Sequence, residues 1–140
     1  MIDKFFLDTN IFIYSLDRLD ARKQQIADSL VFKALDTGDG VVSFQVVQEF
    51  FNVALKRMAT PMTLESAEHY LARVFMRMLG VYPSHALFSE ALRLHATTQK
   101  HWYDALIVSA ARSAGCSVLY SEDLQHGQRF GSLRVVNPFV

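Results

Sequence analysis

The chain has 140 residues, of which 51% are hydrophobic and 12% aromatic, and its 14 basic residues balance its 14 acidic ones. These values predict a single compact domain over residues 1–140 and exclude a disordered or low-complexity protein. Zero net charge argues against a simple basic nucleic-acid-binding module. It is weaker evidence against a nuclease, because bound divalent cations would supply positive charge at the site.

The sequence shows no pattern of a membrane-spanning or secretory segment. No apolar run approaches the roughly 18–20 residues that a membrane span needs, and the N-terminus lacks the pattern of a secretory signal. Cys116 is the only cysteine, and the five histidines lack the spacing of a zinc site. We therefore expect a cytoplasmic protein that does not associate with membranes and has neither a disulfide nor a cysteine metal cluster.

The first half of the chain alternates short apolar runs with helical patterns. Its first run, Phe5-Phe6-Leu7, is continuously apolar, as in a parallel sheet with both faces covered. The expected elements are a strand over 4–7, a short helix from a cap at Asn10 to about Leu16, a longer helix from a cap at Asp20 to Gly38 and Gly40, a strand over 41–42, and a helix from a cap at Ser43 to about Met58.

The second half is mainly helical and ends in strands. The expected elements are helices over 63–79, 84–98 and 102–114, the last closed by Gly115, then a strand over 117–120 and a final strand near 134–136. Strands separated by helices predict an α/β domain with a mainly parallel sheet and helices on both sides.

Carboxylates follow two of the predicted strands, where ligands bind in parallel sheets. Asp8 follows the first strand, and Glu122 and Asp123 follow the strand over 117–120. Turn chemistry explains Asp8 equally well, and helix capping explains its neighbours Thr9 and Asn10. Asp123 is the preferred functional residue of the second pair, although composition and spacing do not separate it from Glu122.

Asp104 is more informative, because it lies in the apolar stripe of its predicted helix. Ile107, Val108 and Ala111 stand three, four and seven residues later, on the same helical face. A carboxylate in that position needs a cation or a polar cavity. The alternative is an acid in the first turn that the helix dipole favours.

Glu49, in contrast, lies on the polar side of its predicted helix. Its side of the helix is polar, so periodicity alone predicts a solvated residue. That side is nevertheless rich in amides and follows a strand end, so it could equally border the cleft. The polar neighbours of Glu49 are Gln45, Gln48, Asn52 and Lys56.

Two groups of basic and aromatic residues are candidates for substrate contact, and a set of apolar residues is expected to form core. Phosphate-binding and base-stacking candidates are Arg18, Arg22 and Lys23 after the first helix, and Lys100, His101, Trp102 and Tyr103 before Asp104. The alternative is that these charges are a solvated surface and these aromatics are core. A further apolar set is interpreted as core rather than as a partner groove: Phe32, Leu35, Phe50, Phe51, Leu71, Phe75 and Met78.

Taken together, "FLDTNIFIYSLD", "VVQEFFNV", "WYDALIVSAA", "LYSEDL" and "VVNPF" resemble the PIN-domain family of metal-dependent ribonucleases, and especially its small VapC-like toxins. The match runs through the whole chain in order and spacing. The resemblance implies a three-layer fold in which helices flank a central, mainly parallel sheet of about five strands.

The same resemblance implies which residues form the site. It assigns Asp8, Glu49, Asp104 and Asp123 as catalytic and metal-binding residues, with Glu122 as a further possible ligand. Thr9, Asn10 and Ser121 match the polar positions that support the acids. Thus Glu49 becomes a site residue through the family pattern and not through its spacing.

Such a set of oxygen ligands suits Mg²⁺ or Mn²⁺. We expect one or two ions to activate a water that attacks an RNA phosphodiester in line. Asp8 and Asp104 are the expected principal ligands, while Glu49 and Asp123 hold a second ion or orient the water. The resemblance further implies products with a 5′-phosphate and a 3′-hydroxyl, a cognate antitoxin and a homodimer.

Two other readings compete with a ribonuclease. A haloacid-dehalogenase-like phosphatase also begins with a strand that ends in an aspartate, but it needs a second acid where this chain has Asn10. A non-catalytic α/β module that binds nucleic acid or protein is the main alternative, and the zero net charge gives it mild support.

Overall fold

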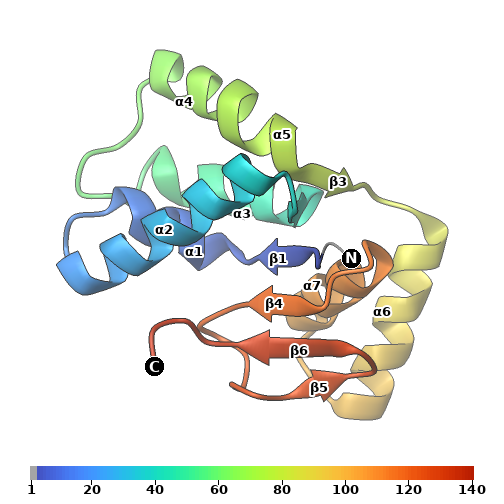
Figure 1. Ribbon diagram of the computed structural model, residues 1–140. Helices are drawn as coiled ribbons and strands as arrows, with labels where there is room; N and C mark the ends of the chain where they lie inside the picture. Colours follow the sequence, from blue (N-terminus) through green and yellow to red (C-terminus); the bar gives the residue numbers. More distant parts are fainter. Residues whose placement is uncertain (1–2) are drawn as a thin grey trace.

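The computed structural model describes residues 3–140, which form one six-stranded sheet with helices on both sides (Figure 1). The strand order is β3-β2-β1-β4-β6-β5, and every neighbouring pair is parallel except β5 with β6. The strands are β1 (Phe5–Leu7), β2 (Gly40–Ser43), β3 (Leu79–Val81), β4 (Val118–Tyr120), β5 (Arg129–Phe130) and β6 (Leu133–Val136).

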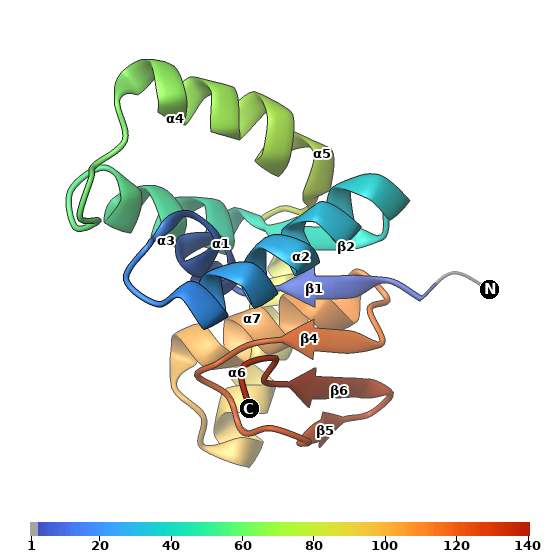
Figure 2. The same ribbon diagram turned by 60° about the vertical axis from the view of Figure 1, so that its left-hand side comes forward.

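The helices complete a three-layer α/β fold, as the sequence predicts. They are α1 (Thr9–Leu16), α2 (Ala21–Thr37), α3 (Phe44–Ala54), α4 (Leu64–Tyr70), the π-helical segment η1 (Leu71–Phe75), α5 (Met76–Met78), α6 (His85–Thr98) and α7 (Trp102–Ser113). Two ribbon views show α6 and α7 on one side of the sheet, and α1 and α2 on the other (Figures 1 and 2). Among residues 3–140, no helix combines the length and apolarity needed to cross a bilayer.

Two strands are additional to those expected, so the sheet has six strands rather than about five. β3 pairs with Val42 and Ser43 of β2, and β5 pairs in antiparallel fashion with β6. Both are short, and their stability comes from partners elsewhere in the sheet rather than from local pattern. The predicted helix over 63–79 is correspondingly divided into α4, η1 and α5, with its last residue in β3.

Local hydrogen bonds move two predicted helix boundaries, and a third cap lacks its expected bond. The first helix begins at Thr9 and its cap is Asp8, not Asn10, because the Asp8 carboxylate accepts the Thr9 amide hydrogen. Ser43 occupies the cap position of α3, but its side chain makes no capping bond. α3 ends at Ala54 rather than near Met58, since the Ala54 carbonyl accepts from Met62 as the chain turns back.

The core lies on both faces of the central strands. All three residues of β1 are buried, and an aromatic cluster built on Phe12, Phe50 and Phe75 packs between α1, α3 and η1. Two members of the predicted core stripe are instead on the surface, because Phe32 is 68% exposed and Leu71 is 37% exposed. The helical stripe of α2 and η1 is therefore only partly covered by the rest of the domain.

Strand pairing brings two acidic turns together. Leu7 of β1 lies in register with Tyr120 of β4, and the Asp8 amide donates to the Tyr120 carbonyl at 3.0 Å. The residue after each of these strands therefore emerges at the same edge of the sheet. β2, the other neighbour of β1, leads directly into α3 at that edge.

α2 packs so closely on β2 that Gly40 has no room for a side chain. A Cβ at position 40 would lie 2.2 Å from Ala34 Cβ and 2.9 Å from Ala34 Cα. We expect Gly40→Ala to lower the free energy of unfolding by about 1–3 kcal/mol in urea denaturation, because the helix must shift. Gly80→Ala is the control, since its nearest contact would be Val41 Cγ1 at 3.4 Å. Equal stability of the two variants would contradict this close packing.

Candidate metal and active site

A cleft of about 240 Å³ opens at the carboxyl edge of the sheet and contains all four predicted acids. These acids come from four separate segments: the end of β1, α3, the first turn of α7 and the turn after β4. The cleft is lined by Asp8, Thr9, Asn10, Gln45, Glu49, Asn52, Val53, Tyr103, Asp104, Ile107 and Asp123. The amides Gln45 and Asn52 are thus additional to the predicted site residues, and Tyr103 is a predicted candidate for substrate contact.

Asp8 lies at the centre of the hydrogen bonding in this cleft. Its Oδ1 accepts from the Thr9 amide and its Oδ2 from the Ser121 hydroxyl, each at 2.8 Å. Ser121 is completely buried, so it acts on Asp8 and not on solvent. Burial, together with the smaller effect of the charges of Glu49 and Asp123, raises the pKa of Asp8 to about 6, although the two hydrogen bonds act to lower it.

Glu49 lines the cleft and accepts a hydrogen bond from α1. The Thr9 hydroxyl donates to Glu49 Oε1 at 2.8 Å, which joins α1 to α3. The polar side of α3 borders the cleft, and Gln45 on that side is only 4% exposed. Periodicity on its own was misleading here, because a buried polar cleft and solvent produce the same helical pattern.

Asp123 receives a hydrogen bond from Asn10 Nδ2 at 3.1 Å. Burial raises the pKa of Asp123, as do the negative charges of Asp104 and Glu122. The effect of Asp104 on Asp123 indicates that the first turn of α7 lies near the turn after β4. Asp104 itself is partly buried and lines the cleft, in agreement with its place in the apolar stripe.

Glu122 is held on the outside of the cleft by α1 and α2. Its Oε1 accepts from the Tyr14 hydroxyl, and its Oε2 forms an ion pair with Lys23 Nζ at 2.6 Å. Burial alone would raise the pKa of Glu122, but these two contacts outweigh it and lower the pKa. Both oxygens of Glu122 are therefore occupied, and Lys23 is bound to a carboxylate.

Apart from Tyr103, the residues predicted to bind substrate do not line the cleft. None of Arg18, Arg22, Lys23, Lys100 or Trp102 is among the cleft residues of the described chain. Arg18 instead lines a separate hollow of about 490 Å³ beside Met58 to Thr60. Their assignment to substrate remains a prediction.

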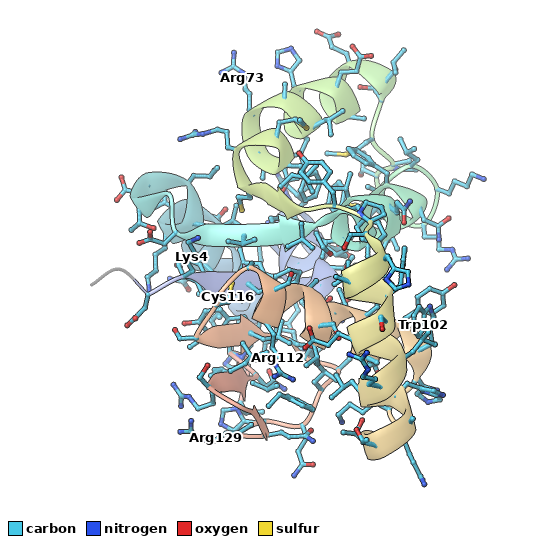
Figure 3. The ribbon with its side chains drawn as sticks, turned by 90° about the vertical axis from the view of Figure 1, so that its right-hand side faces the viewer. Lys4, Arg73, Trp102, Arg112, Cys116 and Arg129 are labelled. Carbon is cyan, nitrogen blue, oxygen red and sulfur yellow. The ribbon has the colours of Figure 1, made fainter. Side chains whose placement is uncertain are left out.

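The aromatic residues before Asp104 divide between core and surface. Trp102 stacks on Phe88 of α6, with ring centroids 6.4 Å apart, and Figure 3 shows it beside that helix. Lys100 Nζ lies 5.8 Å from the ring of Phe130. Tyr103 is 65% exposed and lines the cleft, which leaves its ring accessible to an unpaired base.

The donor chemistry of the cleft suits a hard divalent cation, because its charged groups are all carboxylates. Within residues 3–140, however, no three acidic, histidine or cysteine side chains are grouped so that they could hold a metal ion as they stand. Asp8, Glu49 and Asp123 are each directed to a neutral hydrogen-bond donor instead. In this structure neutral donors hold these three carboxylates.

The chain matches known proteins by family and by fold. The family model described as "PIN domain" matches residues 5–129. The fold resembles Mycobacterium tuberculosis VapC20, described as a sarcin-ricin loop cleaving toxin, with a TM-score of 0.63 and 16% identity over 86% of this chain and 90% of that one. No curated protein matches the sequence.

Two further solved structures share the fold over nearly their whole length. A toxin–antitoxin complex from Klebsiella pneumoniae has a TM-score of 0.66 and 18% identity, over 96% of this chain and 98% of that one. A DNA-bound VapBC from Salmonella typhimurium has a TM-score of 0.61 and 22% identity, over 96% of this chain and 97% of that one.

The raised pKa of Asp8 predicts that Asp8→Asn stabilises the metal-free protein at neutral pH. A carboxyl whose pKa is about 6 in the fold and 3.8 as a model group costs the fold about 3 kcal/mol above pH 6. That cost falls as the pH falls and vanishes below 3.8, where Asp8 is protonated in both states. Urea unfolding in chelator at pH 7 and pH 4 measures this; equal stability at pH 7 would contradict it.

The contact between Lys23 and Glu122 predicts a measurable coupling energy. We expect Lys23→Met and Glu122→Gln to be coupled by about 0.5–1 kcal/mol at pH 7, because the pair is partly shielded from water. The pKa of Glu122 is lowered, so this stability exists above the ordinary pKa of 4.5 and is lost as acid protonates the group. Urea unfolding of the four proteins at neutral and acid pH checks both points.

Proposed function

Since the PIN-domain model matches residues 5–129, which is most of the chain, this protein belongs to the PIN-domain family, and from that premise we propose that it is a metal-dependent endoribonuclease. The substrate is single-stranded or structured RNA, and the reaction is hydrolysis of a phosphodiester bond. The cofactor is Mg²⁺ or Mn²⁺, bound as one or two ions.

One observation carries this proposal: four carboxylates from four separate segments line one small cleft at the carboxyl edge of a parallel sheet. This is the edge at which α/β folds bind ligands. Burial and neighbouring charges raise the pKa of Asp8 and Asp123, so the metal-free cleft is electrostatically unfavourable. A bound cation reduces the repulsion between the carboxylates, whereas a phosphate that enters the cleft without a cation adds to it.

The residues of the cleft have distinct roles in the proposed reaction. Asp8 is the central ligand, and Ser121 and the Thr9 amide fix its orientation. Asp104 is the second principal ligand, while Glu49 and Asp123 bind a second ion or orient the attacking water. The bound ions supply an activated water and stabilise the charge that develops on the phosphate.

Partners are proposed on the same family basis. The solved structures of similar fold include toxin–antitoxin complexes, which supports a role as the toxin of a toxin–antitoxin pair with a cognate antitoxin. Surface apolar residues on α2 and η1, including Phe32 and Leu71, offer area for such a partner or for a second copy. We further propose a cytoplasmic location and a homodimer.

The decisive experiment measures cleavage of mixed single-stranded RNA with and without Mg²⁺ or Mn²⁺. We expect cleavage that requires metal and that falls more than about 100-fold in Asp8→Asn, because this variant removes the central carboxylate. Asp36→Asn is the matched control, since Asp36 is an exposed acid on α2 outside the cleft. It should cleave at the wild-type rate.

Thermal melting gives an independent readout of the metal. Millimolar Mn²⁺ should raise the melting midpoint of wild type and Asp36→Asn by mass action, and it should not raise that of Asp8→Asn. Identical behaviour of wild type and Asp8→Asn in both assays would show that the protein is a non-catalytic module or uses another site.

A further inference from the structure

Among the described residues that line the cleft, Gln45 is the one with a buried polar atom that has no hydrogen-bond partner. It lies on α3, one helical turn before Glu49, and it is 4% exposed. Its Nε2 donates to the Tyr103 carbonyl at 3.2 Å, in the first turn of α7. Gln45 thereby links the helix that carries Glu49 to the turn that carries Asp104.

This hydrogen bond fixes the orientation of the amide. A backbone carbonyl only accepts, so the nitrogen of the amide must face Tyr103 and the oxygen must face away. Gln45 Oε1 is buried, and it has no hydrogen-bond donor among residues 3–140. An amide oxygen in that state is unfavourable in a folded protein unless a ligand or a water satisfies it.

The chemistry of the missing donor is restricted. Phosphate oxygens and ionised carboxylates have no proton to donate, so neither an RNA phosphate nor an ionised neighbouring acid can satisfy Oε1. Oε1 exposes less than 1 Å², so a donor reaches it only after a small movement of the neighbouring side chains, and water is the smallest such donor. Mg²⁺ and similar ions in carboxylate sites keep several of their waters, and each such water is a hydrogen-bond donor.

We propose that Gln45 is a positioning residue whose Oε1 accepts a hydrogen bond from a metal-bound water, while its Nε2 holds the first turn of α7 in place. This inference rests on the proposed function, because it requires a divalent ion in the cleft. The outer hydrogen-bond partners of a metal site commonly change its affinity by 10–100-fold. Gln45 therefore increases the affinity of the cleft for the ion without being one of the acids.

Titration calorimetry with Mn²⁺ alone tests this on the full chain, with no RNA present. Gln45→Met keeps the length of the side chain but removes the acceptor, and we expect it to weaken Mn²⁺ binding about 10-fold. Its metal-free melting midpoint should change little, because the loss of the hydrogen bond to the Tyr103 carbonyl is offset by removal of a buried oxygen that has no donor. Gln45→Glu keeps an oxygen acceptor and should bind Mn²⁺ at least as tightly as wild type.

Gln48 provides matched controls, since it is exposed on the same helix and lies outside the cleft. Gln48→Met and Gln48→Glu reproduce the changes in polarity and charge, and neither should alter Mn²⁺ binding by more than about twofold. Comparing the Mn²⁺ affinity of Gln45→Glu with that of Gln48→Glu separates the effect of an acceptor at position 45 from the general effect of one more negative charge.

Two results would overturn the inference while leaving the proposed function intact. If Gln45→Met retains wild-type Mn²⁺ affinity while Asp8→Asn loses it, Oε1 does not act on the ion. Alternatively, Gln45→Glu and Gln45→Met could weaken binding equally, which would assign the whole effect to the lost Tyr103 contact. Absence of Mn²⁺ binding in the wild type would overturn both the inference and the proposed function.

Discussion

Repulsion between carboxylates is the constraint on which the arrangement of this cleft depends. Without metal, three of the four acids are stabilised by a different neutral donor: Ser121 for Asp8, Thr9 for Glu49 and Asn10 for Asp123. Each donor orients its acid and offsets part of the cost of burial. Asn10 matters in this respect, because a second acid at that position would repel Asp123 instead of binding it.

The parallel sheet makes such crowding possible because it gives the acids a rigid base. β1 and β4 are adjacent and in register, so Asp8 and the turn at Ser121 are positioned by backbone hydrogen bonds rather than by their own side chains. Buried residues fill β1 completely, which resists movement of the strand end. Long-range packing of α3 and α7 then supplies the other two acids from outside the sheet.

The sequence predicted those features that a local pattern determines. Asp104 stood out because it interrupts an apolar stripe, and the α/β class followed from apolar runs separated by helices. Glu49 could not be assigned in this way, since a polar helical face looks the same beside a cleft as beside solvent. β3 was missed because it directly follows a helix and has a glycine at its centre, and β5 because it has only two residues; both are defined by their partners in the sheet.

Glu122 and Asp123 show the same limit at the scale of adjacent residues. No local rule separates two neighbouring acids in a polar turn, yet Tyr14 and Lys23 hold one on the outside and Asn10 directs the other inward. The donors that separate them lie about 100 residues earlier in the chain. The sequence alone therefore identified the turn, whereas the fold determines which of its acids faces the cleft.

The same electrostatics link metal and RNA in the proposed reaction. A cleft lined by four carboxylates repels a phosphodiester, and the basic residues expected to attract RNA lie outside it. One or two divalent ions bound to the acids remove most or all of the local negative charge, so they must increase the affinity for a phosphate at that position. By thermodynamic linkage, RNA must increase the affinity for the ion by the same factor. In the proposed reaction, metal binding thus favours contact between the cleft and RNA.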